Sequence, residues 1–142
     1  MDVKQVIVMR DKFPDGKGGI VTPRKGKFIA QGSHASMAWI VDRCKPRRWY
    51  QRLWDLFFPL KKFSEVEQEW MNGAFAKICV KCDSEEQLLE IYNQAKSAKL
   101  EVHMITDSGR TEFGGVPTKT CLAIGPDLSS KIDPITKSLT LL

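Results

Sequence analysis

Residues 3–9, VKQVIVM, are mostly apolar and β-branched, with little of the polar alternation found in a strand that has one face in water. Such a run is typical of a strand covered on both faces. From about residue 27 the apolar residues recur at helical spacing, and the two patterns then alternate along the chain. This alternation favours an α/β fold, in which helices cover the faces of a sheet.

The remaining elements follow from the same two periods and from capping residues. Strands are predicted at 3–9, 76–81, 102–106 and 120–124, and helices at 27–43, 64–72, 84–99 and 129–138. The order β-α-(α)-β-α-β-β-α predicts a three-layer α/β/α sandwich around a small four-stranded mixed sheet, within one domain over residues 1–142. Helical crossovers join the first three strands, which we expect to be parallel, and the fourth is expected to turn back.

The overall composition, 42% hydrophobic and 27% charged residues among 142, is ordinary for a soluble globular protein. The chain lacks an apolar run long enough for a transmembrane helix, and MDVKQVIVMR does not resemble a signal peptide. We therefore expect a cytoplasmic protein. The net charge of +5 favours an anionic partner such as nucleic acid without identifying it.

Two of the four cysteines, Cys79 and Cys82, form a CxxC inside a strand pattern. Three residues apart on a strand, their side chains point to opposite faces. The sequence has no second CxxC and no His pair at ligand spacing. We expect buried structural thiols, and neither a metal site nor a cofactor.

The helix predicted from residue 27 has two distinct sides. Lys27, Gln31 and His34 share one side, at spacings of four and seven residues from the lysine. The apolar residues on the other side are Ile29, Met37, Ile40, Val41 and Cys44.

Two loops are expected at one edge of the sheet, where sites in α/β folds gather. The loop after the first strand leads to Lys27, and the loop after the third begins at Asp107, in DSGRT. An Asp can orient and activate a water while a Lys stabilises charge on a carbonyl oxygen, which permits ester or amide hydrolysis without a metal or a Ser or Cys nucleophile. The alternative is a surface ion pair beside a glycine-containing turn, and spacing alone favours that alternative.

Several segments together are similar to one known family. RKGKFIAQGSHA resembles the lysine-rich helix start of the type 2 (archaeal and eukaryotic-type) peptidyl-tRNA hydrolases, and DSGRTE resembles that family's Asp-Ala-Gly-x-Thr loop. KICVKCDSEEQLLEIYNQAKSAKL is similar to its central strand and helix, and TCLAIGPDLSSKIDPITKSLTLL to its C-terminal strand and helix. These segments occur in the family's order and cover most of the chain.

The resemblance implies a homodimeric, metal-independent enzyme that hydrolyses the ester between a peptide and the 3′-terminal ribose of tRNA. The residues that match the family's functional positions are Lys27, Asp107, Thr111 and Thr120, with Thr118 as the alternative to Thr120. Gln31 and His34 match positions on the family's helix. Candidate contacts to the tRNA backbone are Arg110, Lys17, Lys25 and Lys77.

The chain also departs from the family pattern. The loop FGGVPTK is longer than the usual Pro-Pro-Gly-Thr segment, which leaves the choice between Thr118 and Thr120 open. Asp107-Ser108-Gly109 replaces Asp-Ala-Gly. A non-catalytic module that binds tRNA or a protein on the same fold is therefore the alternative function.

A basic and aromatic insertion at about 45–62, KPRRWYQRLWDLFFPLKK, has no counterpart in the family's short polar connection. A helix from about residue 48 would place one stripe on its surface, formed by Tyr50, Leu53, Trp54, Phe57 and Phe58. One hypothesis is that this stripe packs onto its own domain or a dimer partner. The other is that it stays open and contacts tRNA or an anionic membrane surface.

Overall fold

The computed structural model describes residues 1–45, 48–57, 62–110 and 113–142. The strands are β1 (Val3–Arg10), β2 (Phe13–Pro14), β3 (Ile20–Val21), β4 (Lys77–Cys82), β5 (Val102–Asp107), β6 (Thr118–Leu128) and β7 (Thr140–Leu141). The helices are α1 (Lys25–Cys44), α2 (Trp49–Phe57), α3 (Glu65–Asn72), α4 (Glu85–Ser97) and α5 (Ser129–Thr136). The predicted α/β class is confirmed.

The main sheet has five strands in the order β5-β6-β1-β4-β7, and not the four that were expected. The additional strand, β7, pairs antiparallel with β4 and has only two residues, too few to show a period in the sequence. β1 and β4 are parallel, and β6 is antiparallel to both β1 and β5. β1, β4 and β5 therefore share one direction and β6 turns back, as predicted.

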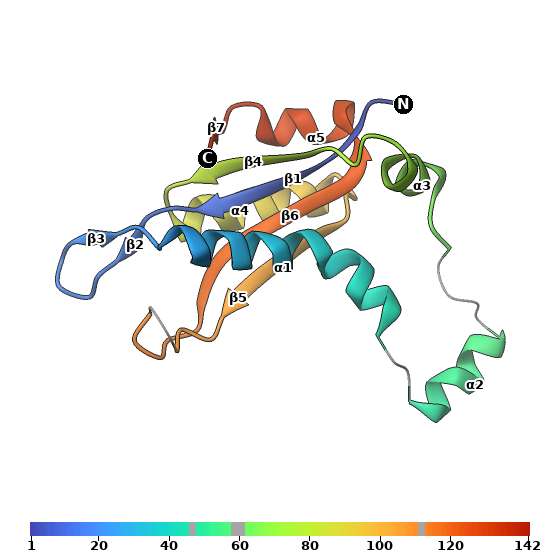
Figure 1. Ribbon diagram of the computed structural model, residues 1–142, viewed down its shortest axis with the longest axis horizontal. Helices are drawn as coiled ribbons and strands as arrows, with labels where there is room; N and C mark the ends of the chain where they lie inside the picture. Colours follow the sequence, from blue (N-terminus) through green and yellow to red (C-terminus); the bar gives the residue numbers. More distant parts are fainter. Residues whose placement is uncertain (46–47, 58–61, 111–112) are drawn as a thin grey trace.

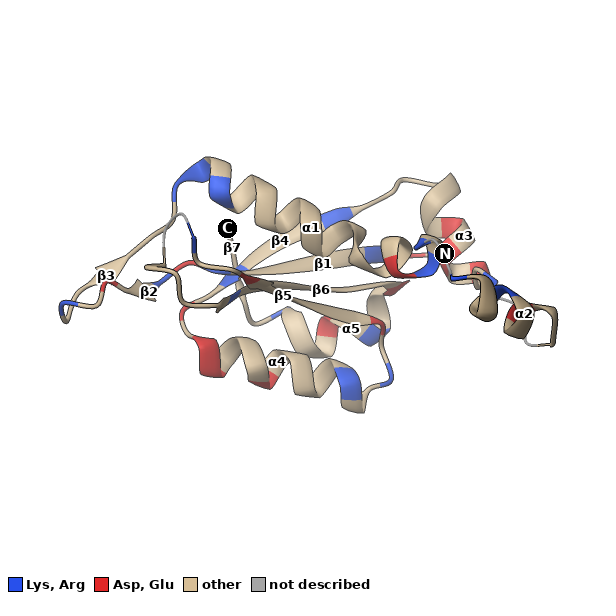
Figure 2. Ribbon diagram, turned by 90° about the horizontal axis from the view of Figure 1, so that it is seen from below, with Lys and Arg blue, Asp and Glu red and all other residues tan. Residues whose placement is uncertain are grey.

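Helices cover both faces of this sheet (Figure 1). Figure 2 shows α1 on one side and α4 and α5 on the other. Alternate residues of β1 face the two sides, because side chains on a strand alternate. Val6 and Val8 join the core cluster under α4 and α5, and Ile7 and Met9 join the cluster under α1. β1 is thus covered on both faces, as its apolar run predicted.

Serine side chains cap the first turns of α3 and α4 and explain where these helices begin. The Ser64 side chain accepts a hydrogen bond from the Glu67 N–H, and the Glu67 carboxylate accepts one from the Ser64 N–H in return, which forms a capping box. α3 ends at Gly73. Ser84 caps α4 through the N–H of Gln87.

The apolar side of α1 that was identified from the sequence is not its buried side. The helix instead buries Gln31, Ala35 and Trp39, while Ile29 and Met37 are 70% and 56% exposed. Close approach to the sheet explains this choice, since the small Gly32 and Ala35 face β1 and let the helix pack near the strand on this side. An apolar surface is left on the outer side of α1.

α2 forms within the predicted insertion and extends away from the sheet (Figure 1). None of its residues is buried, so the hypothesis that its stripe packs onto the same chain is wrong for the described residues. Phe58, assigned to that stripe, lies outside the described residues. Within the described part of the chain, no helix is long and apolar enough to cross a membrane.

The expectation of buried thiols holds for only two of the four cysteines. Cys82 and Cys121 are buried, but Cys44 and Cys79 are exposed. Cys79 and Cys82 do face opposite sides of β4, as their spacing predicted, but α1 leaves the Cys79 side uncovered because it packs over β1, β5 and β6.

Candidate active site

Lys27 and Asp107 meet at one edge of the sheet, where the first turn of α1 lies beside the end of β5. The Lys27 Nζ atom is 2.7 Å from Asp107 Oδ2, and the two side chains are 15% and 12% exposed. Pro23 precedes the helix, and the carbonyl of Arg24 accepts the Lys27 N–H, which places the lysine in the first turn. The two loops therefore meet as the parallel strand directions predicted.

Two further donors hold the Asp107 carboxylate. Its Oδ2 atom accepts a hydrogen bond from Gln31 Nε2 at 2.8 Å, and its Oδ1 atom accepts one from the N–H of Gly109 at 2.7 Å. The hydrogen bond from Lys27 lowers the pKa of Asp107 most, and the Gly109 and Gln31 donors lower it further against the opposing effect of burial. Asp107 is consequently a carboxylate at neutral pH.

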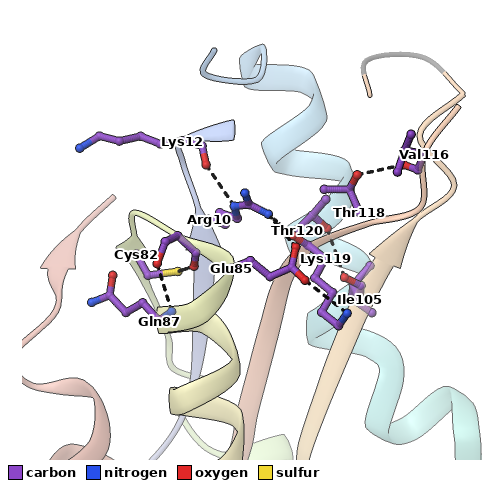
Figure 3. Close-up of polar contacts among 11 residues, drawn as sticks. Arg10, Lys12, Cys82, Glu85, Gln87, Ile105, Val116, Thr118, Lys119 and Thr120 are labelled. Atoms are coloured by element: carbon purple, nitrogen blue, oxygen red, sulfur yellow. Dashed lines mark hydrogen bonds and ion pairs between the residues drawn. The ribbon is translucent and has the colours of Figure 1, made fainter. Parts of the chain in front are cut away.

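Gln31 links this carboxylate to β6. The Thr120 hydroxyl donates to Gln31 Oε1 at 2.8 Å, which directs the amide nitrogen of Gln31 toward Asp107. Thr120 also lies 3.4 Å from the carbonyl of Ile105 (Figure 3). The Thr118 hydroxyl instead donates to the carbonyl of Val116 at 2.9 Å. Of the two candidate threonines, Thr120 thus contacts the site through Gln31.

An aromatic wall that sequence reasoning missed lies beside Lys27. The lysine nitrogen is 5.5 Å from the ring centroid of Phe113, whose ring is 4.7 Å from that of Phe13. The guanidinium of Arg10 lies 4.4 Å from the centroid of Phe13 and is held by Glu85 at 3.2 Å (Figure 3). The only signal in the sequence is that a charged residue, Arg10, ends an apolar strand.

The other predicted site residues do not all lie beside Lys27 and Asp107. His34 lines a groove between α1 and β5 that also contains Asp107, and exposed Lys25 and Arg110 lie at the same edge of the sheet. Lys77 does not join them, because it pairs in register with Gln5 at the opposite end of β1 and lies over the ring of Phe75. Lys17 is in the turn between β2 and β3.

Thr111 lies outside the described residues. Within the described ranges, no three His, Cys, Asp or Glu side chains are grouped closely enough to bind a metal ion. Among the described residues, those that converge on the site are one carboxylate, one ammonium group, one amide and one hydroxyl. Such a set can orient a water molecule and stabilise a developing oxyanion.

We expect Lys27→Met to raise the pKa of Asp107. The substitution removes the largest cause of the low value and leaves the burial that opposes it. Titration of ¹³C-labelled Asp carboxyl groups by NMR measures this pKa, which should lie below the ordinary range of an Asp in the parent protein. Asp83, whose pKa is lowered by Lys12, is the internal control and should not change. An unchanged Asp107 titration would show that the ion pair does not persist in solution.

Comparison with known proteins identifies a family over almost the whole chain. The family model described as "Peptidyl-tRNA hydrolase PTH2" matches residues 3–142. A peptidyl-tRNA hydrolase from Methanocaldococcus jannaschii is 34% identical over 140 residues, which cover 99% of this chain and 100% of that protein. A peptidyl-tRNA hydrolase from Methanopyrus kandleri is 32% identical over 139 residues, with 98% and 97% covered. One from Methanothermobacter thermautotrophicus is 34% identical over 144 residues, with 99% and 100% covered.

Proposed function

This chain belongs to the peptidyl-tRNA hydrolase PTH2 family, and from that premise we propose that it hydrolyses the ester between a peptide, or an N-blocked amino acid, and the 3′-terminal ribose of tRNA. The observation that carries the proposal is the half-enclosed Lys27–Asp107 pair, with its donors from Gln31 and Gly109. Peptidyl-tRNA is made by ribosomes, so the proposal places the activity in the cytoplasm.

In the proposed reaction, a water molecule attacks the ester carbonyl carbon and Asp107 orients that water. The low pKa of Asp107 makes it a weak base while Lys27 is bound to it. As the carbonyl oxygen becomes negative, the Lys27 ammonium turns toward it and frees Oδ2 to accept the proton of the water. The proton then passes to the departing ribose oxygen, and the products are a free peptide carboxyl group and tRNA with a free hydroxyl. The mechanism needs neither a metal ion nor a covalent intermediate.

Thr120 and Gln31 have positioning roles in this proposal. The buried hydroxyl of Thr120 fixes the amide of Gln31, and the amide fixes Asp107 Oδ2. Thr111, which the family resemblance assigns to the site, is proposed to position the water or the ester. His34 lines the groove beside the carboxylate and is proposed to contact the acyl or nucleotide part of the substrate.

Exposed basic side chains near this edge are proposed to contact tRNA phosphates. Lys25, Arg110 and Lys17 are exposed and lie around the first turn of α1, the loop after β5 and the β2–β3 turn. Contacts to phosphates add affinity without sequence preference, which suits an enzyme that accepts all tRNAs. Lys77 is excluded from this group because it lies at the other end of the sheet.

The test of activity is incubation of the purified chain with N-acetyl-aminoacyl-tRNA, with release of free tRNA followed over time. The proposal requires release well above the spontaneous rate, and release should weaken at high salt as phosphate contacts are screened. Binding of tRNA without release at any salt concentration would favour the alternative, a non-catalytic tRNA-binding module.

We further propose that the chain acts as a homodimer through the outer side of α1. Ile29 and Met37 are exposed there and border an apolar groove that also includes Phe28, Cys79 and Leu142. A continuous apolar surface of this kind marks an interaction site, and a second copy offers the same surface in return.

We expect Met37→Glu to weaken self-association by at least about a hundredfold, because an unpaired carboxylate would be buried in an apolar interface. Sedimentation velocity over a concentration series measures the monomer–dimer equilibrium. Ile20→Glu adds the same charge at a residue that is 71% exposed in the β2–β3 hairpin and should leave the equilibrium unchanged. A parent protein that is monomeric at all concentrations would rule out this role of α1.

A further inference from the structure

α2 exposes an unusual set of large apolar side chains. Six of its nine residues are apolar or aromatic, and each of the six is between 43% and 78% exposed: Trp49, Tyr50, Leu53, Trp54, Leu56 and Phe57. Figure 1 shows the helix extending from the body of the molecule at the end of α1 that is remote from the β2–β3 hairpin. An exposed group of this size calls for a partner, because large apolar patches are rarely left in water.

The helical period gathers these six side chains on one continuous side of α2. At about 100° per residue, Leu56, Trp49, Leu53, Phe57, Tyr50 and Trp54 follow one another around this side. Gln51, Arg52 and Asp55 lie on the opposite side. The helix therefore has one apolar and one polar side, although none of its residues is buried.

The segment around α2 also accounts for the net charge of the protein. Residues 45–62 contain six basic residues and one acidic residue, Asp55. The whole chain has 22 Lys and Arg and 17 Asp and Glu, so the residues outside this segment include 16 of each sign and are neutral in sum. The basic residues of the segment are Lys45, Arg47, Arg48, Arg52, Lys61 and Lys62. Its partner is therefore expected to be anionic as well as apolar.

We propose that α2 is a membrane-binding element, which lays its apolar side into the surface of an anionic lipid bilayer while the described basic residues Lys45, Arg48, Arg52 and Lys62 contact the headgroups. A short amphipathic helix with Trp, Phe and Leu on one side and basic residues around it is typical of interfacial binding. An anionic bilayer supplies both an apolar layer and negative charge. Attachment of this kind is peripheral and reversible.

The side chains of α2 favour lipid over RNA. Single-stranded RNA is bound by stacking of bases on aromatic rings, with cations beside the rings. Leu53 and Leu56 have no ring, and they lie on the same side as the tryptophans. The basic Arg52 is on the opposite side. A mixed aliphatic and aromatic surface matches acyl chains and the glycerol region of a bilayer better than a row of bases.

The length of α1 separates this element from the chemistry. Lys27 is in the first turn of α1 and α2 follows its last turn at Cys44, so the helix separates the two by about 26 Å, at about 1.5 Å per residue. Membrane binding would thus fix where the enzyme acts without altering the proposed catalytic residues.

Tryptophan fluorescence of the full chain reports this binding selectively. Trp49 and Trp54 are 75% and 64% exposed, whereas Trp39 and Trp70 are 2% and 1% exposed and already buried. Titration with vesicles of phosphatidylcholine and phosphatidylglycerol should therefore shift the emission to shorter wavelength as α2 enters the interface. Vesicles of phosphatidylcholine alone should have a much smaller effect, and salt should weaken the anionic response.

A matched pair of variants tests the apolar side. Leu56→Glu retains both reporter tryptophans and should lower vesicle affinity by at least about tenfold, the effect of losing one buried leucine side chain. Ile20→Glu has the same change in charge at a residue of similar exposure, 71% against 77%, and should reduce affinity much less. Absence of an emission shift on anionic vesicles, or equal affinity of Leu56→Glu and the parent, would overturn the proposal.

Three other measurements separate the alternatives. Replacement of residues 46–60 by a short Gly-Ser linker should abolish vesicle binding while the hydrolysis rate at saturating substrate stays within a few-fold of the parent. A folded protein whose saturated rate collapses would instead place α2 in the active site. Loss of tRNA affinity in Leu56→Glu with unchanged vesicle affinity would identify an RNA surface. Conversion of a dimer to a monomer by Leu56→Glu would identify an interface between copies. Each of the last three results overturns the proposal.

Discussion

Lys27→Ala is expected to lower the rate of peptidyl-tRNA hydrolysis at saturating substrate by at least about a hundredfold, the scale on which a single electrostatic group acts in catalysis. The ammonium is the cation that faces Asp107 at 2.7 Å, and its loss removes the group proposed to stabilise the oxyanion. Asp107→Ala should reduce the rate by a similar factor, because the water loses its orienting carboxylate. Single-turnover release of tRNA, with enzyme in excess, measures both effects.

Both variants should remain folded, because their side chains lie at a helix start and a strand end and not within either core cluster. Lys131→Ala is the control for deletion of an ion-paired lysine. Lys131 is 3.1 Å from Asp127 and is half-exposed on α5, on the other face of the sheet. A rate near that of the parent for Lys27→Ala, with Lys131→Ala equally active, would show that the site lies elsewhere.

Gly109→Ala is expected to lower kcat/KM by about a hundredfold, the loss that accompanies a displacement of catalytic groups by about 1 Å. Gly109 has φ +75°, and a Cβ atom there would lie 2.1 Å from the carbonyl oxygen of Val116. The carbonyl of Gly109 also accepts the N–H groups of Phe113 and Gly115, and its own N–H donates to Asp107. The clash would displace this loop, and with it one of the donors to the carboxylate.

Gly114→Ala is the matched control for this loop. Gly114 also has a positive φ, +60°, but a Cβ atom there meets nothing within 4 Å. The backbone strain is similar and the clash is absent, so kcat/KM should stay within a few-fold of the parent. Steady-state kinetics on N-acetyl-aminoacyl-tRNA measures both variants. Equal losses of kcat/KM in the two variants would attribute the effect to backbone strain. If both variants kept the activity of the parent, Gly109 would not be needed to position Asp107.

The meeting of Lys27 and Asp107 was predictable because it depends on topology alone. Strands that run in one direction end at one edge of a sheet, and both loops follow such strands. The starts of α3 and α4 were predictable for a local reason, since Ser64 and Ser84 cap the first turns within their own segments. These features require only the order of the elements or neighbours in the chain.

The contacts that surround Asp107 and Lys27 were harder to predict from the sequence. Gln31 was placed correctly on the side of Lys27, but its link to Thr120 depends on the register between β5 and β6, which shifts at Ile105. Phe13 reaches Phe113 only because the glycine-containing loop folds back as the β2–β3 hairpin. A two-residue strand has no period, so neither this hairpin nor the wall it supports was predicted.

The outer side of α1 illustrates a conflict between pattern and packing. Ile29 and Met37 fall on one side at helical spacing, which ordinarily marks a core face. The sheet instead receives the side with small residues and Gln31, because only that side permits close approach and pairs the buried amide with Asp107 and Thr120. Periodicity identifies two sides of a helix, but packing decides which of them is buried.

The most direct test of the central claim, that Lys27 and Asp107 form one hydrolytic unit, is a double-mutant cycle on the single-turnover rate of tRNA release from N-acetyl-aminoacyl-tRNA. Groups that act as a unit give non-additive losses. The account predicts release far above the spontaneous rate in the parent and a loss of at least about a hundredfold in each single Ala variant. It predicts no more than a few-fold further loss in the double variant. A double variant that is slower by the product of the two single losses, or one as fast as the parent, would contradict it.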